Sequence, residues 1–261
     1  MNFREIFIIS RGTKVIFAIT FTVSVLAILV AIIYYRGLNN SEDPRIFKAR
    51  ELLSAYDQNP GTIGDIRSFA LLDSAGAIFR SMPDYRSSFE MGLIYNNKCS
   101  ALLLIAIYDS TISEAEKKEL LSLSLDFCDT SIMIYRRWIK EWSSASAEEI
   151  ANKLSPFMTI DDPAFMGRDF ERIFSGRVKN ISLAQIETPR RLSVSLTNKG
   201  IINRHLMRPD SSLKYYREAL SLWEENSAAK SNLSVLLGGE PVKPSIIESL
   251  FPPDRRKGLN R

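Results

Sequence analysis

An unbroken apolar segment near the N-terminus constrains this chain more than any other feature. Residues 15–35 read VIFAITFTVSVLAILVAIIYY and contain no charged side chain. As a helix rising about 1.5 Å per residue, the segment spans the roughly 30 Å hydrocarbon core of a bilayer. A cleaved signal peptide has only about 7–15 apolar residues and ends at small residues, whereas this segment ends in Tyr34, Tyr35 and Arg36. The sequence therefore predicts one transmembrane helix over residues 15–35, preceded by an N-terminal stub of residues 1–14.

The orientation of this helix depends on the basic residues that flank it, because cytoplasmic flanks carry more Lys and Arg than outer flanks. Here the two sides nearly balance, with Arg4, Arg11 and Lys14 before the segment and Arg36, Arg45, Lys48 and Arg50 after it. A short N-terminal stub usually stays inside. We therefore expect a single-pass protein of the cell (inner) membrane whose soluble domain lies on the outer, periplasmic face.

The rest of the chain carries the start signals of helices. Ser113-x-x-Glu116 and Ser146-x-x-Glu149 match the capping box. Three more helix starts are indicated by a capping side chain before a proline, at Asp43-Pro44, Asp162-Pro163 and Thr188-Pro189. No Asn-Gly or Asp-Gly hairpin signal and no sustained apolar–polar alternation indicates a strand. The fold class is therefore expected to be all-α.

The helix start signals also predict how the chain is organised. A linker at residues 36–43 joins the membrane helix to a helical domain over residues 44–238, and a tail follows at 239–261. The expected helices cover residues 44–57, 65–82, 85–108, 114–142, 147–158, 163–186, 189–206, 211–224 and 227–237.

Small and aromatic residues recur at fixed spacing in the C-terminal part of this domain. Counted from Ser193, the fourth and eighth positions are Leu196 and Gly200, and the twentieth, twenty-fourth and twenty-seventh are Ser212, Tyr216 and Ala219. This spacing resembles the tetratricopeptide repeat (TPR) family, although Lys199, Asn203 and Glu224 depart from its pattern. The resemblance implies a right-handed α-solenoid of helical hairpins that binds peptides or partner helices in a concave groove. A helical bundle outside the TPR family is the alternative.

A weaker match begins at Tyr85, with Gly92 and Tyr95 at the eighth and eleventh positions. If both registers hold, the resemblance implies a partner-binding groove lined by the first helix of each repeat. Its residues would be Arg86, Phe89, Leu93, Asn96 and Asn97 in one repeat and Val194, Thr197, Ile201, Arg204 and His205 in the other. The Lys and Asn with which some TPR proteins clamp a C-terminal carboxylate are absent from the fifth and ninth positions. A protein partner presenting an amphipathic helix or peptide fits this groove better.

Charge and isolated motifs weigh against other functions. The 34 basic and 30 acidic residues are mixed along the chain, which gives a net charge of +4 and no basic stripe for a nucleic acid. His205 is the only histidine, and no metal site or cofactor is expected around it. Ser211-x-x-Lys214 formally matches a Ser–Lys nucleophile pair, but the motifs that accompany such a pair are missing.

Two further pairs of residues have structural interpretations. Cys99 and Cys128 lie in apolar helical patterns, which favours two buried free thiols over a disulfide. Trp138 and Trp142 lie one helical turn apart, which indicates core packing.

We therefore expect a membrane-anchored TPR-like scaffold or adaptor that is not an enzyme and binds a protein partner in an envelope-associated complex. An ancillary factor of an export channel or a collar scaffold of a flagellar motor has this layout, and the analogy rests on layout alone. A hydrolase using Ser211 and Lys214 is one alternative. A small-molecule substrate-binding subunit is another, and it would require an enclosed apolar pocket.

Overall fold

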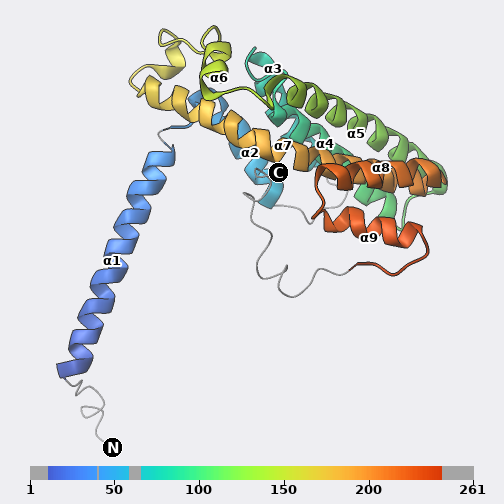
Figure 1. The fold of residues 1–261 in the computed structure, drawn as a ribbon, viewed down its shortest axis with the longest axis horizontal. Helices are drawn as coiled ribbons and strands as arrows, with labels where there is room; N and C mark the ends of the chain where they lie inside the picture. Colours follow the sequence, from blue (N-terminus) through green and yellow to red (C-terminus); the bar gives the residue numbers. More distant parts are fainter. Residues whose placement is uncertain (1–10, 40, 59–65, 243–261) are drawn as a thin grey trace, which may run out of the picture.

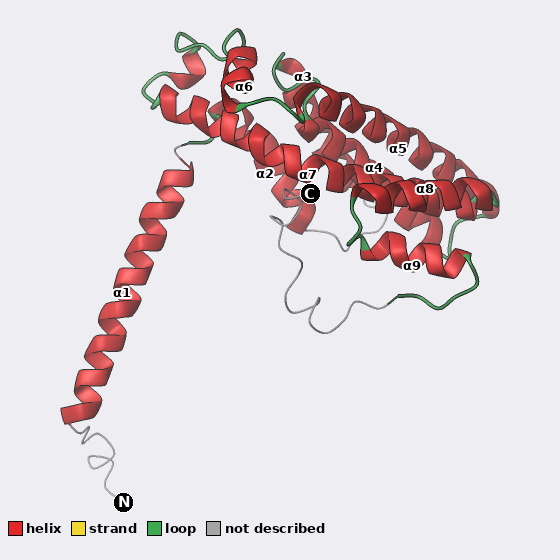
Figure 2. Cartoon of the chain, viewed as in Figure 1, coloured by secondary structure: helices red, strands yellow, loops and turns green. Residues whose placement is uncertain are grey.

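The computed structural model describes residues 11–39, 41–58 and 66–242. Within these residues the chain forms nine α-helices and two short 3₁₀ helices and has no strand (Figure 2). The all-α prediction is therefore confirmed for the described part of the chain. The N-terminal stub up to residue 10 and the tail from residue 243 lie outside the described residues.

The first helix, α1 (Arg11–Asn39), extends away from the rest of the molecule (Figure 1). Its segment Gly12–Ala31 has a mean hydropathy of 2.4, and none of it is buried against the protein. A second helix, α4 (Phe89–Tyr108), is also long and apolar enough to span a bilayer, but it packs inside the helical domain. The length and composition of α1 fit both a membrane anchor and a signal sequence.

Three antiparallel helix pairs and one final helix build the domain. They are α2 (Phe47–Gln58) with α3 (Ile66–Ser81), α4 with α5 (Glu114–Trp142), and α7 (Phe170–His205) with α8 (Pro209–Leu222), followed by α9 (Ser227–Leu236). Between α5 and α7 lie the short α6 (Ala147–Leu154) and η3 (Pro163–Phe165), and η2 (Pro44–Ile46) precedes α2. The pairs pack in chain order, since α3 contacts α4, α5 contacts α7 and α8 contacts α9.

The first helices of the first two pairs run parallel to each other. Arg45, just before α2, bonds to Asp84, just before α4. About three turns later, the hydroxyl of Tyr56 in α2 donates to the main-chain carbonyl of Asn97 in α4. Because the contacts advance in the same direction along both helices, α2 and α4 have the same polarity.

The same relation holds between α4 and the second half of α7. The guanidinium of Arg191 lies over the ring of Phe89, and farther along the side chain of Asn198 donates to Ser100. The start of α9 continues the order, because Asn226 donates to Ser193 of α7. The first helices of the three pairs, α2, α4 and α7, and the final helix α9 are thus linked by side-chain contacts in sequence order.

Two glycines permit close packing within the second and third pairs. A Cβ atom at Gly92 of α4 would overlap the ring of Tyr135 in α5, and one at Gly200 of α7 would overlap the ring of Tyr216 in α8. Both tyrosines are fully buried. Gly200 and Tyr216 are the eighth and twenty-fourth positions of the spacing found in the sequence, so that spacing corresponds to a real contact.

The predicted break at Thr188-Pro189 is wrong, because α7 continues through Pro189 as one helix of 36 residues. A proline in a helix removes the hydrogen bond to the carbonyl four residues earlier. Tertiary packing holds the helix together here. Thr188 is fully buried, and the side chain of Gln185 donates to the carbonyls of Trp142 and Ala145. The two capping boxes and the caps at Asp43 and Asp162 form as predicted.

Candidate functional site

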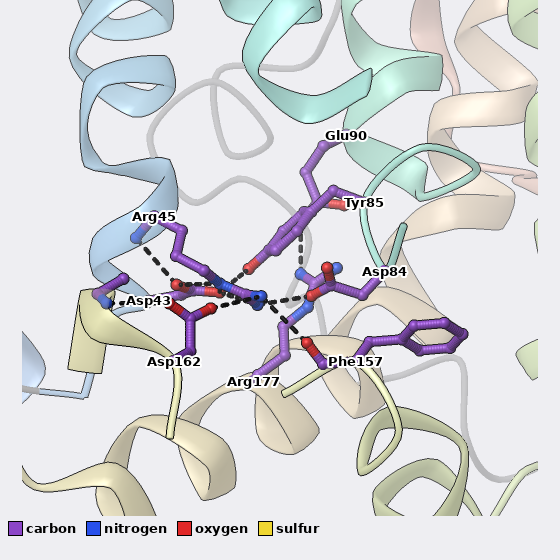
Figure 3. A network of polar contacts seen from close by, with 9 residues as sticks. Asp43, Arg45, Asp84, Tyr85, Glu90, Phe157, Asp162 and Arg177 are labelled. Carbon is purple, nitrogen blue, oxygen red and sulfur yellow. Dashed lines mark hydrogen bonds and ion pairs between the residues drawn. The ribbon is translucent and has the colours of Figure 1, made fainter. Parts of the chain in front are cut away.

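A cluster of ionic side chains lies just after the membrane-length helix (Figure 3). It joins segments from five parts of the chain: the linker after α1, the turn before α4, the first turn of α4, the loop between α6 and α7, and the first half of α7. We call it the linker ion cluster, and its residues are Asp43, Arg45, Asp84, Tyr85, Glu90, Asp162 and Arg177.

Asp43 organises the linker side of the cluster. Its carboxylate caps η2 by accepting from the main-chain N–H of Arg45 at 3.0 Å, and it also accepts the Arg45 side chain at 2.8 Å. The hydroxyl of Tyr85 donates to the same carboxylate at 3.1 Å. The sequence signal Asp43-Pro44 therefore predicts the cap but not the contacts with Tyr85 and the Arg45 side chain.

Arg45 connects this cap to two other segments. Its Nη2 is 2.8 Å from the buried carboxylate of Asp84, and its Nη1 donates to the main-chain carbonyl of Phe157 at 3.2 Å. The same Nη1 lies 3.8 Å from Asp162, which caps η3. One guanidinium thus holds the linker, the turn before α4 and the loop after α6 together.

Arg177 fills the interior of the cluster. Its side chain is 2% exposed, it pairs with Glu90 of α4, and its guanidinium lies 4.0 Å from the centre of the Tyr85 ring. The adjacent residue, Gly176, contacts the backbone of Ser41 so closely that a Cβ atom would overlap the Ser41 carbonyl. The chain leaving α1 is therefore seated directly on α7.

Burial controls the protonation of the cluster. It raises the pKa of Asp84 above the ordinary value of 3.8, and the charges of Arg45 and Arg177 only partly oppose this rise. Burial also raises the pKa of Tyr85, so its hydroxyl remains a neutral donor. For Arg177, burial lowers the pKa but the Glu90 carboxylate and Tyr85 outweigh burial, so the pKa is raised overall.

The cluster is short of positive charge and of hydrogen bonds. Its four carboxylates, Asp43, Asp84, Glu90 and Asp162, face two guanidinium groups. Among the described residues, Asp84 Oδ1, Ser88 Oγ, Glu90 Oε2 and Arg177 Nε are buried without a hydrogen-bond partner. Unpaired buried polar atoms are costly. The arrangement therefore depends on the two arginines. It fixes the geometry of the joined segments but adds little to the free energy of unfolding.

The contacts of the cluster join separate segments of the chain. The cluster contains no thiol or imidazole, and its one hydroxyl, that of Tyr85, is a neutral donor to Asp43. The part of the chain that the structure describes holds no group of three or more His, Cys, Asp or Glu side chains arranged to bind a metal ion.

The predicted groove residues of α4 fall in two environments. Arg86 is exposed, whereas Phe89 is half-buried and packs edge-on against Trp138. Leu93, Asn96 and Asn97 are half-buried. The Asn96 side chain faces α7.

The predicted residues of α7 are also divided. Thr197 is buried, and its hydroxyl accepts from Asn226 at the start of α9. Val194 is 37% exposed, and Ile201 packs on the main core. Arg204 and His205 are half-buried near the end of the helix. Burial, together with Arg204 and Lys117, lowers the pKa of His205.

The structure brings Asn96 together with residues that the sequence did not single out. Asn96 Oδ1 accepts from Ser195 Oγ at 2.8 Å and from Asn198 Nδ2 at 3.2 Å, and Asn198 Nδ2 also donates to Ser100 Oγ at 3.0 Å. Asn97 lies beside Asn96 on α4. We call Asn96, Asn97, Ser100 and Asn198 the amide cluster. Ser100 lies one helical turn after Asn96, and Asn198 lies one turn after Val194. This spacing from predicted groove residues is the sequence signal that could have identified them.

The remaining candidate motifs are placed apart from both clusters. Ser211 is half-buried in the first turn of α8, and Lys214 is exposed. Cys99 and Cys128 are free and fully buried, as the apolar pattern predicts. Trp138 and Trp142 stack with ring centres 6.4 Å apart, in agreement with the predicted core role. A hollow at the junction of α5 and α6 is lined mainly by polar residues: Glu141, Ser144, Ala145, Glu149, Asn152 and Lys153.

Comparison with protein-family models, curated proteins and solved structures finds no match to this chain. The functional argument therefore depends on the described geometry.

Proposed function

We propose that this chain is a single-pass membrane protein whose TPR-like helical domain acts as a scaffold for a protein partner at the outer face of the cell membrane. The observation that carries the proposal is α1. Its Gly12–Ala31 segment has a mean hydropathy of 2.4 and contacts no other part of the described protein. A soluble domain would leave such a surface in water at a large cost in free energy, whereas a bilayer covers it.

The linker ion cluster supports the scaffold role. Only a few residues separate the end of α1 at Asn39 from the cap at Asp43. Arg45 then joins this segment to the turn before α4, and the close approach of Ser41 to Gly176 seats it on α7. A scaffold needs such a fixed exit, because a flexible linker would let the domain turn freely relative to the membrane.

The order of the helices supports the TPR-like part of the proposal. The first helices of the pairs (α2, α4 and α7) alternate with returning helices, and a glycine packs against a buried tyrosine in both the second and the third pair. Repeat arrays of this kind present their inner helices as an extended binding face.

Fractionation of cells expressing the full chain tests the membrane part of the proposal. We expect the protein to remain in the membrane pellet after alkaline carbonate washing, at its full-length mass. Release into the soluble fraction in a shortened form would instead show that α1 is a cleaved signal sequence.

Purification in a mild detergent tests the scaffold part. We expect a partner protein at fixed stoichiometry that survives a second purification step. A single pure species from several detergents and growth conditions would refute the scaffold role.

A further inference from the structure

Two cysteines lie opposite each other in the second helix pair. Cys99 is on α4 and Cys128 is on α5, and both side chains are fully buried. Seven residues before Cys99, Gly92 packs against Tyr135 of α5, and Tyr135 lies seven residues after Cys128. Because the two helices are antiparallel, this register places the cysteines side by side. The Cys99 side chain accordingly hydrogen bonds to the Cys128 thiol.

Two serines show how closely the backbones of α4 and α5 approach on both sides of Cys128. Ser124 Oγ donates to the main-chain carbonyl of Cys99 at 2.8 Å, and Ser131 Oγ donates to that of Gly92 at 2.9 Å. A side chain as short as serine reaches an opposite backbone only where two helices are in close contact. Ser124 Oγ also lies 3.5 Å from Cys99 Sγ. The cysteines therefore meet where the helices are close enough for the Cβ–Cβ separation of about 3.5–4.5 Å that a disulfide requires.

We propose that Cys99 and Cys128 are a redox pair that closes to a disulfide and cross-links α4 to α5. The chain has no other cysteine, so neither thiol has another partner within the protein. The oxidant is an external disulfide, either that of a thiol–disulfide oxidoreductase or oxidised glutathione. The thiolate of one cysteine attacks a sulfur of this disulfide and expels a thiolate, and the second cysteine then attacks the mixed disulfide and expels the other. The pair loses two electrons and two protons, and the external disulfide is reduced to two thiols.

Burial determines when this bond forms. The Cys99 side chain and burial raise the pKa of the Cys128 thiol, so the folded domain offers little thiolate to an external reagent. We therefore expect oxidation during folding, before α5 closes on α4, and slow reduction afterwards. The outer face of a cell membrane is an oxidising environment, so the expectation that the bond forms in cells rests on the proposed location of the domain.

Refolding of the full-length protein tests the pairing. The protein is reduced and unfolded in detergent and urea, and refolded with oxidised glutathione until its far-UV circular dichroism recovers. It is then denatured, treated with N-ethylmaleimide and weighed by intact-mass spectrometry. We expect the wild type to carry neither maleimide nor glutathione, at a mass two hydrogen atoms below that of the reduced chain. Cys99→Ala and Cys128→Ala are matched controls, because each keeps one cysteine and should carry either glutathione or maleimide.

Thermal unfolding of the same samples measures the effect of the cross-link. The oxidised wild type should have a Tm about 4–16 °C above that of the reduced wild type, because the bond restricts the unfolded chain. Neither alanine variant should show this rise. A refolded wild type that carries two maleimide or glutathione groups, a disulfide-linked dimer on a non-reducing gel, or a lower Tm for the oxidised form would each overturn the proposal.

The same maleimide assay on cells, with thiols blocked at harvest, separates this inference from the proposed function. A bond that forms on refolding and is present in cells supports both. A bond that forms on refolding but is absent in cells would support the redox pair and contradict the outer-face location. Failure to form the bond in either setting would overturn only the redox pair, since co-purification of a partner does not depend on it.

Discussion

The charge imbalance of the linker ion cluster predicts that its cations and carboxylates have unequal effects on stability. We consider two variants of the same buried pair, Arg177→Met and Glu90→Gln. Arg177 is 2% exposed and Glu90 10% exposed at the side chain, so both groups are shielded from water. If only the pair mattered, removing either member would destabilise the protein equally.

The charges around the pair make the two substitutions unequal. Without Arg177, the carboxylates of Glu90 and Asp84 remain buried and Arg45 is the only cation left, so we expect a loss of about 3–5 kcal/mol, as for other buried charges left unpaired. Without the charge on Glu90, Arg177 keeps the Tyr85 ring and the field of Asp84. Only a charged hydrogen bond is then weakened, and we expect a loss of about 1–2 kcal/mol.

Thermal unfolding of the full chain in detergent, followed by far-UV circular dichroism, measures the difference. For a domain of this size about 1 kcal/mol corresponds to roughly 2–4 °C in Tm. Arg177→Met should therefore lower Tm by about 6–20 °C and Glu90→Gln by about 2–8 °C. Arg177→Lys, which keeps the positive charge, should fall between the wild type and Arg177→Met. Equal losses for the Met and Gln variants, or a larger loss for Glu90→Gln, would refute the argument from charge imbalance.

Three further outcomes are expected. Gly200→Ala should destabilise the domain by about 1–3 kcal/mol in urea unfolding because the new methyl group overlaps the Tyr216 ring. Gly76→Ala should be neutral or stabilising, because its methyl group meets the flexible end of Arg80 and makes an ordinary contact with Ile94. Because burial raises the folded-state pKa of Asp84, the folded chain binds that proton more tightly. Wild type should therefore gain stability relative to Asp84→Asn as the pH falls from 7 towards 3.8, and a relative loss would contradict the assignment. Val25→Lys places a charge at the centre of α1, at a cost of about 2.5–3.5 kcal/mol, and should reduce the carbonate-resistant fraction, whereas Val25→Ile should not.

Local sequence signals specify much of the fold because they act within one or two helical turns. The capping boxes at Ser113 and Ser146 form as the spacing predicts. The Gly200–Tyr216 spacing corresponds to a contact between α7 and α8. The helix break predicted at Pro189 is wrong because other segments of the chain pack against the helix there. Helix propensity alone does not account for such packing.

The two clusters are harder to predict because their members are far apart in the chain. Asp43 is predicted only as a helix cap and Asp84 is 41 residues away, and only the folded chain places an arginine between them. Asn96 belongs to the predicted groove, but its contact with Asn198 depends on how α4 and α7 align. No pattern within a single helix specifies that alignment. Contacts between polar residues that are far apart in the chain therefore cannot be predicted from one sequence.

The length of α7 relates the two clusters to each other. In a simple repeat array each hairpin contacts only its neighbours. Here the first half of α7 carries Arg177 into the cluster beside α1, and the second half carries Asn198 to the face shared with α4. Because α7 is continuous through Pro189, one helix joins the segment that follows α1 to the face shared with α4. Under the proposed role of a membrane-anchored scaffold, a partner protein bound on that face would be held at a defined distance from the bilayer.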